Sequence, residues 1–317
     1  MPTVLVAGGA GFIGSHLCDA LLNKGHNVIC VDNFLTSSEE NIRHLKDNSS
    51  FKFLKHNIIE ALPGDLRTDA VFHLASPASP NSHSKISYQA LPLETMLANT
   101  QGTMRLLEFA QNCNAKFLFA STSEVYGDPL EHPQNENYRG NVSSTGPRSV
   151  YDESKRFGET ITSYFSRERN TDTKIARIFN TYGPRMNKDD MRMIINFISQ
   201  ALVGDSITVF GDGSQTRSLC YVSDTVDGFM KLMFSDNTSG QVVNIGSVEE
   251  HSVLEFADLV KKLTDSHSEI VFSEELPKDD PIKRKPDISK AKSLLEWEPK
   301  VGLEEGLLKT IEYVKNL

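Results

Sequence analysis

A tyrosine and a lysine four positions apart, Tyr151 and Lys155, are the residues best suited to do chemistry. On a helix, residues at this spacing share one face. A lysine ammonium beside a phenol favours the phenolate, and therefore lowers the tyrosine pKa from its ordinary value of about 10. Such a tyrosine can take a proton from a sugar hydroxyl as hydride leaves for a nicotinamide. On its own, the pair also fits a solvated helix face.

Two polar side chains, Thr122 and Glu124, follow a predicted strand at residues 116–120. A parallel α/β sheet binds its ligands at the carboxyl ends of the strands. We therefore expect both side chains to meet Tyr151 and Lys155 as catalytic partners. Taken alone, Thr122 and Glu124 also fit a helix cap and an exposed carboxylate.

A glycine-rich turn with glycines at positions 8, 11 and 14 joins the first predicted strand to the first predicted helix. Glycine lets the backbone bend tightly and approach a pyrophosphate, and the helix N-terminus adds free N–H groups. Asp32 ends the next strand about 20 residues on, where a dinucleotide fold places a carboxylate for a ribose hydroxyl. Because Asp32 would repel a 2′-phosphate, the motif predicts NAD rather than NADP. The alternative is a plain glycine turn with Asp32 as a helix cap.

The elements that would position these residues alternate between short apolar runs and helical stretches. Strands are predicted at residues 4–7, 28–31, 51–54, 70–74, 116–120 and 174–178, and helices at 13–23, 93–111 and 151–167. This alternation is typical of βαβ units and of a parallel sheet covered on both faces. We therefore predict an α/β protein with a doubly wound Rossmann sheet. Gly25 suits a left-handed cap after the first helix.

The pattern changes after about residue 180, where turns become frequent and the predicted helices become shorter. We expect a Rossmann domain at residues 1–180, to which the chain returns at about 219–246 with a strand near 242–245. Residues 181–218 and 247–317 are expected to form a smaller C-terminal substrate-binding domain.

Composition argues against several other classes of protein. The formal net charge of −9 gives no general attraction to nucleic acid or to an anionic membrane. No apolar run reaches the roughly 18 residues that a membrane span needs, and the N-terminus has no signal-peptide pattern, so we expect a cytoplasmic protein. The four cysteines form no CxxC pair and no cluster with histidine, so no metal site is predicted.

Together these motifs resemble the extended short-chain dehydrogenases/reductases, the NAD-dependent epimerase/dehydratase family, over essentially the whole chain. The glycine turn, residues 73–75 (HLA) and 121–123 (STS), the Tyr151/Lys155 pair and residues 183–185 (GPR) carry this resemblance. Longer stretches are similar to the UDP-glucuronate decarboxylases of this family. They are residues 76–80 (SPASP), 121–129 (STSEVYGDP), 146–156 (GPRSVYDESKR), 177–186 (RIFNTYGPRM), 211–217 (GDGSQTR) and 284–288 (RKPDI).

The resemblance implies a reaction that converts UDP-glucuronate to UDP-xylose. Tyr151 would remove the proton of the C4 hydroxyl while hydride passes from C4 to NAD. The resulting 4-keto sugar is a β-keto acid, which loses CO2 because the ketone takes up the electrons left behind. Protonation at C5 and return of the hydride would complete the reaction. Thr122 would hydrogen-bond the C4 oxygen, and Glu124 would act near C5.

The resemblance also implies binding residues. For the UDP-sugar it implies Asn180, Arg185 and Arg217 near the diphosphate, Phe210 beside the uracil, and Arg284 near the reacting carboxylate. Guanidinium groups suit a diphosphate because they donate paired hydrogen bonds, although each arginine alone also fits a surface salt bridge. For NAD it implies Gly8, Gly11, Phe12, Ile13, Gly14, Asp32, Asn33, Asn57, Ile58, Leu74, Ala75, Ser76, Asn99, Tyr151 and Lys155.

Two positions depart from the family pattern. Asn57 replaces the aspartate expected beside the adenine, and its amide oxygen can still accept a hydrogen bond from the adenine amine. Residues 81–91 differ from the decarboxylase pattern in a loop that lies near the sugar in the family. The second departure bears on the choice of substrate more than on the cofactor.

Related activities remain as alternatives. Nucleotide-hexose 4,6-dehydratases typically carry Asp-Glu after the threonine, and many 4-epimerases lack the glutamate, whereas this chain has Ser123 and Glu124. This pair favours decarboxylation over a UDP-glucuronate 4-epimerase or a 4,6-dehydratase. A non-catalytic NAD-binding protein is the alternative of another class. The resemblance also implies a homodimer in which the helices at 93–111 and 151–167 pair across a two-fold axis.

Overall fold

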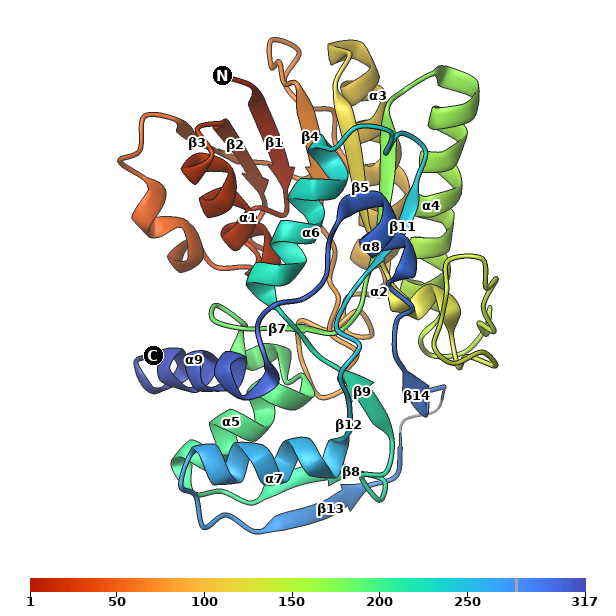
Figure 1. Cartoon of the computed structure of the whole chain (residues 1–317). Helices are drawn as coiled ribbons and strands as arrows, with labels where there is room; N and C mark the ends of the chain where they lie inside the picture. The colour runs from red at the N-terminus through yellow and green to blue at the C-terminus, as the bar shows by residue number, and fades with distance from the viewer. Residues whose placement is uncertain (277–278) are drawn as a thin grey trace.

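The computed structural model describes residues 1–276 and 279–317 (Figure 1). Its largest element is a seven-stranded sheet with the order β11-β6-β5-β4-β1-β2-β3, in which every pairing is parallel. The doubly wound α/β fold predicted from the sequence is confirmed. The strands are β1 (Thr3–Ala7), β2 (Asn27–Asp32), β3 (Phe51–Lys55), β4 (Ala70–His73), β5 (Lys116–Thr122), β6 (Thr173–Ile178) and β11 (Val242–Ile245).

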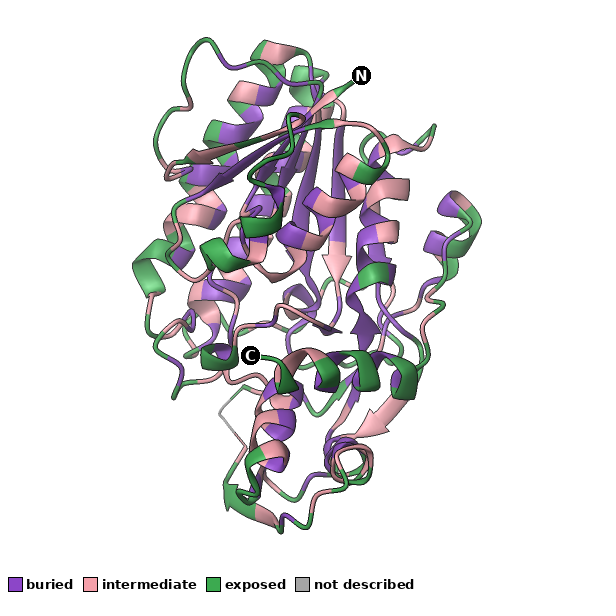
Figure 2. Cartoon of the chain, turned by 90° about the vertical axis from the view of Figure 1, so that its left-hand side faces the viewer, coloured by how far each residue is buried: buried purple, intermediate pink, exposed green. Residues whose placement is uncertain are grey.

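The central strands are apolar on both faces because both faces of the sheet are covered. In β1, Val4 and Val6 belong to one apolar core, and Leu5 and Ala7 belong to the core on the opposite face. Alternate residues of a strand point to opposite faces, so one unbroken apolar run supplies both cores. Figure 2 shows the central strands as a buried layer between the flanking helices. Each fully buried valine or leucine stabilises the fold by about 1.5–3 kcal/mol.

Helices cover both faces of the sheet. One core contains side chains of α1 (Phe12–Asn23), α6 (Val222–Phe234) and α8 (Ser289–Leu295), and the other contains side chains of α3 (Thr103–Cys113) and α4 (Ser149–Arg169). Gly25 follows α1 with a φ of 82°, so its predicted left-handed conformation is confirmed.

The prediction of a single helix at residues 93–111 is wrong in one respect. The structure divides this stretch into α2 (Pro92–Leu97), a π-helical turn η2 (Ala98–Gly102) and α3. The wider turn lies against α4, where the Asn99 amide nitrogen donates to the Ser154 hydroxyl at 3.0 Å. The spacing of apolar residues does not reveal such a turn, because the helix after the turn has an apolar face like the helix before it.

Most of the remaining elements lie below the large sheet in Figure 1. They include α5 (Met193–Val203), α7 (Val253–Leu263) and α9 (Leu303–Lys315). The short helices η3 (Ser123–Tyr126) and η4 (Lys188–Asp190) stand on loops, and η1 (Glu39–Leu45) lies beside α1. Among the described residues, three small sheets pair β7 (Thr181–Tyr182) with β10 (Cys220–Tyr221), β8 (Ile207–Phe210) with β13 (Ile270–Glu274), and β9 (Thr216–Ser218) with β12 (Glu250–Ser252) and β14 (Lys283–Arg284). None of the helices in the described residues combines the length and apolar character that crossing a membrane requires.

Candidate active site

Three adjoining cavities follow the carboxyl ends of the large sheet. The central cavity has a volume of about 570 Å³ and lies beyond β1, β5 and β6. The glycine-side cavity, of about 350 Å³, shares Gly8, Gly11, Leu74 and Ser76 with it. The arginine-side cavity, of about 190 Å³, shares Pro80, Glu124, Asn180, Thr181, Met186 and Arg192 with the central cavity. Parallel α/β sheets bind ligands at this edge.

The glycine turn lies between the central and glycine-side cavities, and its backbone leaves no room for a side chain on Gly8 or Gly14. A Cβ atom on Gly14 would lie 2.1 Å from the carbonyl oxygen of Gly8, and one on Gly8 would lie 2.7 Å from the backbone nitrogen of Ala75. Both contacts are with backbone atoms, which cannot give way. Gly11 caps α1 without a side-chain hydrogen bond, so the first N–H groups of the helix face a cradle that is free of side chains.

Asp32 lies at the end of β2, where its carboxylate joins the turn to the next loop. It accepts hydrogen bonds from the Ala10 N–H at 3.0 Å, the Phe34 N–H at 2.9 Å and the Ser37 hydroxyl at 2.7 Å. The carboxylate is thus fixed against the glycine-side cavity, which it also lines. A bare backbone cradle at a helix N-terminus, with a fixed carboxylate beside it, fits a dinucleotide without a 2′-phosphate.

The structure places most of the predicted cofactor residues around the glycine turn. Asn99 is an exception, because it is fully buried between η2 and α4 and lines none of these three cavities. Its amide nitrogen donates to the Ser154 hydroxyl, and its contact with the cofactor stays a prediction. The central cavity is lined by Gly8, Gly11, Phe12, Ile13, Gly14, Leu74, Ser76, Tyr151 and Lys155, and the glycine-side cavity by Asp32, Asn33, Asn57, Ile58, Leu74, Ala75 and Ser76.

The four predicted catalytic side chains all line the central cavity. Tyr151 and Lys155 come from the first turns of α4, and Thr122 and Glu124 come from the end of β5 and from η3. The Lys155 amine donates to the Ala120 carbonyl oxygen at 2.9 Å and lies 5.8 Å from the centre of the Tyr151 ring. Thr122 also caps η3, because its hydroxyl accepts from the Glu124 N–H at 3.2 Å.

Burial dominates the acid–base properties of the tyrosine–lysine pair. It lowers the pKa of Lys155 to about 7, although the charge of Glu159 acts in the opposite direction. It raises the pKa of Tyr151, and the hydrogen bond with Thr122 only partly opposes this rise. The predicted net lowering of the Tyr151 pKa is therefore wrong for the ligand-free protein, because burial outweighs the groups that favour the phenolate.

Glu124 lies between two buried arginines, Arg148 and Arg284. Its carboxylate is 2.6 Å from the Arg148 guanidinium and forms a second ion pair with Arg284. Burial by itself would raise the pKa of Glu124, but the two positive charges outweigh it and lower this pKa to about 2. Glu124 is therefore ionised throughout the neutral range.

A second carboxylate extends this cluster. Asp280 pairs with Arg148 at 2.8 Å and with Arg217 at 2.7 Å. We call Glu124, Arg148, Arg217, Asp280 and Arg284 the arginine cluster, and all five line the arginine-side cavity. Three guanidinium groups against two carboxylates leave one net positive charge, so the cluster favours an anionic ligand.

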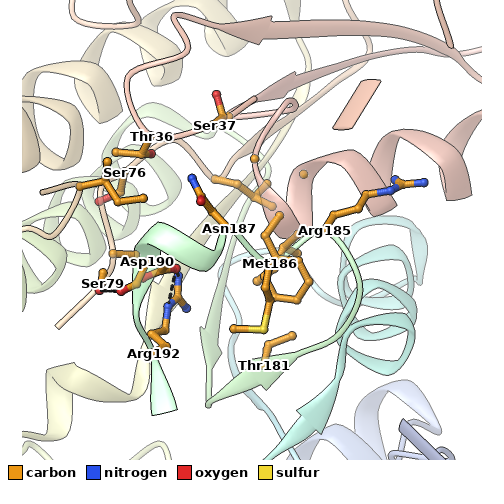
Figure 3. A pocket seen from close by; sticks show the side chains of 18 of the residues that line it. Thr36, Ser37, Ser76, Ser79, Thr181, Arg185, Met186, Asn187, Asp190 and Arg192 are labelled. Carbon is orange, nitrogen blue, oxygen red and sulfur yellow. Dashed lines mark hydrogen bonds and ion pairs between the residues drawn. The ribbon is translucent and has the colours of Figure 1, made fainter. Parts of the chain in front are cut away.

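The other predicted substrate residues divide into two groups. Asn180, Phe210, Arg217 and Arg284 line the arginine-side cavity. Arg185 lies at the edge of the central cavity instead, where its guanidinium pairs with Asp19 of α1 at 2.8 Å. Figure 3 shows the Arg185 side chain directed away from Met186 and Asn187. The structure thus does not bring Arg185 to the arginine cluster, because α1 supplies its counter-charge.

Sequence reasoning missed several residues at this site. Arg148 stands three positions before Tyr151, within the stretch that carries the family resemblance, but its type alone did not indicate burial. Arg192 projects between the central and arginine-side cavities, where Asp190 accepts a hydrogen bond from it at 2.8 Å (Figure 3). Tyr88 stacks on Tyr151 with ring centres 4.9 Å apart. Within the part of the chain that the structure describes, no group of three His, Cys, Asp or Glu side chains could hold a metal ion.

Comparisons with known proteins agree with this site. Residues 4–246 match the NAD dependent epimerase/dehydratase family. The chain is 49% identical over 310 residues to UDP-glucuronic acid decarboxylase 1 of Danio rerio, and the alignment covers 98% of this chain and 72% of that protein. It is 50% identical over 305 residues to UDP-glucuronic acid decarboxylase 6 of Arabidopsis thaliana, covering 96% of this chain and 86% of that protein.

Among solved structures, a UDP-glucuronic acid 4-epimerase from Bacillus cereus, in complex with UDP-glucuronic acid and NAD, superposes with a TM-score of 0.86. It is 32% identical in sequence, and the match covers 99% of each chain. The parallel sheet, the bare glycine turn and the match over most of the sequence show that this chain belongs to the NAD-dependent epimerase/dehydratase family.

Proposed function

We propose that this protein is an NAD-dependent decarboxylase that converts UDP-glucuronate to UDP-xylose. The observation that carries the proposal is that Glu124, paired with Arg148 and Arg284, lines the same cavity as Tyr151 and Lys155. A cavity that joins a proton-accepting phenol to a positively charged cluster suits a sugar that bears a carboxylate. The decarboxylases of Danio rerio and Arabidopsis thaliana share about half of their aligned residues with this chain.

NAD, which the residues of the glycine turn would hold, would supply an acceptor and later a donor of hydride for the sugar carbon. Tyr151 accepts the proton of the C4 hydroxyl, and Thr122, whose hydroxyl bonds to the phenol, orients the same oxygen. The Lys155 amine lies 5.8 Å from the phenol ring centre, and in its protonated form it stabilises the phenolate. Tyr151 is 6% exposed, so water has little access to this proton transfer.

The arginine cluster acts on the other side of the sugar. Arg284 and Arg148 hold the C5 carboxylate beside the 4-keto group, and the bond from C5 to the carboxylate breaks with its electrons moving into the ketone. Because the pKa of Glu124 is about 2, Glu124 acts as an ionised group that positions the arginines. It is not a ready proton donor. Loss of CO2 needs no acid at this point, because the electrons move into the ketone, whereas expulsion of water needs one, and neither the ionised Glu124 nor Ser123 is one. After CO2 leaves, C5 would take up a proton from water in the cavity, and return of the hydride to C4 would complete the reaction.

The remaining residues divide between the cofactor and the nucleotide. Asp32 would accept from the adenosine ribose, which favours NAD over NADP. Arg217 and Asn180 would bind the diphosphate, with Phe210 beside the uracil. We propose that residues 1–180 and 219–246 hold NAD, and that residues 181–218 and 247–317 hold the UDP-sugar.

We also propose that the protein forms a homodimer through the helices that cover the α4 face of the sheet. Several large apolar side chains of α2, α3 and α4 are exposed, as surfaces buried between copies require. We expect Phe157→Glu to convert a dimer to a monomer in light scattering, whereas Leu308→Glu on α9 leaves the mass unchanged. A wild-type protein that scatters as a monomer contradicts the proposal. The exposed residues are Leu93, Met96, Met104, Phe157 and Tyr164.

Mass spectrometry of products from a panel of nucleotide sugars tests the proposed reaction. We expect UDP-glucuronate to give a UDP-pentose and CO2, and dTDP-glucose to remain unchanged. A product that keeps every carbon of UDP-glucuronate would indicate the 4-epimerase, the activity in the name of the Bacillus cereus protein. A 4-keto-6-deoxy product from dTDP-glucose would indicate a 4,6-dehydratase.

A further inference from the structure

Tyr88 lies face to face with the phenol to which the proposed function assigns proton transfer. The ring centres of Tyr88 and Tyr151 are 4.9 Å apart, and their planes are inclined by 10°. Only 1% of Tyr88 is exposed. Tyr88 therefore covers one face of the Tyr151 ring and closes it to solvent.

The segment that carries Tyr88, residues 81–91, is anchored against the wall of the central cavity. The Ser84 hydroxyl donates to the Asp189 carbonyl oxygen at 2.6 Å, and the Asn81 amide donates to the Met191 carbonyl oxygen at 2.8 Å. Next to this segment, the Ser79 hydroxyl donates to the Asp190 carbonyl oxygen at 2.6 Å, and the Tyr88 N–H donates back to the Ser79 carbonyl oxygen. These bonds hold the backbone of the segment that carries Tyr88.

Tyr88 is one of the residues that line the central cavity, and the surroundings of its hydroxyl bear on its role there. This hydroxyl is buried, and among the residues that the structure describes it has no hydrogen-bond partner. Burial raises the pKa of Tyr88, and the nearby charge of Arg148 opposes this rise. The contact between Tyr88 and Tyr151 that the structure shows is the stacked ring, so the inference concerns the ring.

We propose that Tyr88 is a positioning residue for Tyr151, which holds the plane of the phenol ring and keeps water from it. This inference rests on the proposed role of Tyr151 as proton acceptor. A stacked ring restricts the rotation of its partner, and so keeps the phenolic oxygen on Thr122. Exclusion of water also keeps the phenolate unsolvated and therefore strongly basic.

Substitutions of Tyr88 separate ring stacking from the hydroxyl. Tyr88→Phe keeps the stacked ring and should retain kcat within about twofold. Tyr88→Leu removes the stack and should lower kcat roughly tenfold or more, with a smaller change in KM, because the proposed role of Tyr88 is to hold Tyr151 rather than to bind the substrate. Phe234→Leu is the matched control. Phe234 also stacks on another ring, that of His26, with ring centres 5.1 Å apart and planes inclined by 11°, but it lines none of the three cavities. Equal losses of kcat in Tyr88→Phe and Tyr88→Leu, or a Tyr88→Leu variant with normal kcat, would overturn the proposal.

A second measurement does not depend on the substrate. The titration of Tyr151 is obtained from ultraviolet absorbance, as the difference between each protein and the same protein carrying Tyr151→Phe. In Tyr88→Leu this pKa should fall, because water reaches the phenolate, and in Tyr88→Phe it should not change. An unchanged pKa in Tyr88→Leu contradicts the inference, whether or not UDP-glucuronate proves to be the substrate. A wild-type protein that does not turn over UDP-glucuronate contradicts the proposed function alone.

Discussion

The guanidinium of Arg148 lies 2.6 Å from the carboxylate of Glu124, and both residues are within a few positions of a predicted catalytic group in the sequence. Arg148 stands three residues before Tyr151, and Glu124 two residues after Thr122. The ion pair therefore links the start of α4 to η3, which directly follows β5, and α4 and β5 carry the proposed proton-transfer residues. The charge near C5 and the acid–base pair near C4 are thus parts of one rigid arrangement.

Glu124→Gln should abolish most of the decarboxylation while NAD still binds. The amide keeps the shape of the side chain but removes the charge that positions Arg148 and Arg284, so we expect kcat to fall about 10²-fold or more. Steady-state release of CO2 measures the loss, and fluorescence quenching by NAD checks binding. Glu153→Gln on α4 is the control, because Glu153 is 42% exposed and its contact with Arg156 is 3.7 Å long. Normal kcat in Glu124→Gln contradicts the role of the cluster.

The low pKa of Glu124 should appear in the pH dependence of stability. The pKa is about 2 in the folded protein against an ordinary value of 4.5. Ionised Glu124 thus contributes stability that is fully present above about pH 4.5 and is lost as the pH falls towards 2. Denaturant unfolding of the wild type and Glu124→Gln across this window should give curves that converge at low pH. Parallel curves over the whole window would contradict an ionised, arginine-bound Glu124.

Lys155 should produce a pH dependence of the same sign at the basic end. Burial lowers its pKa to about 7 from an ordinary value of 10.5, so between these limits the unfolded chain binds the extra proton. Stability from this group therefore rises as the pH increases from about 7 to 10.5. In Lys155→Met this contribution is absent, and the difference in unfolding free energy between the two proteins should grow with pH in favour of the wild type. A constant difference is the result that refutes the assignment.

Gly14→Ala should remove NAD binding. The added methyl group would lie 2.1 Å from the Gly8 carbonyl oxygen, so α1 or the turn must move away from the cofactor cradle. We expect at least a tenfold loss of NAD affinity by calorimetry, since the turn can no longer approach the pyrophosphate closely. Gly64→Ala is the control because a Cβ atom there meets nothing within 4 Å. If Gly14→Ala binds NAD with normal affinity, the turn accommodates the methyl group and the prediction is wrong.

Much of the fold could be predicted because it depends on local patterns. The apolar runs of β1 and β2 are unbroken, and a strand buried on both faces requires this. The strand predicted near residues 242–245 coincides with β11. The π-helical turn η2 escapes prediction, because one widened turn leaves the apolar pattern of the flanking helices unchanged.

The site was less predictable because its properties depend on contacts that are distant in sequence. Arg148 is buried by Glu124, 24 residues away, and by Asp280, 132 residues away. Nothing near Arg148 in the sequence indicates either partner. For Arg185 the reverse holds. The family motif suggests that it binds the substrate, but in the structure it pairs with Asp19 of α1. The predicted pKa of Tyr151 is wrong for a related reason: spacing shows that Lys155 is near, but not that both groups are desolvated.

Turnover of UDP-glucuronate labelled with ¹³C in its carboxyl group tests the central claim most directly. The label should leave as CO2 while an equal amount of UDP-pentose forms and no NAD is consumed, and Tyr151→Phe should release none. If the label instead remains in a UDP-hexuronate inverted at C4, the protein is an epimerase, and the proposed role of its arginine cluster in decarboxylation is wrong.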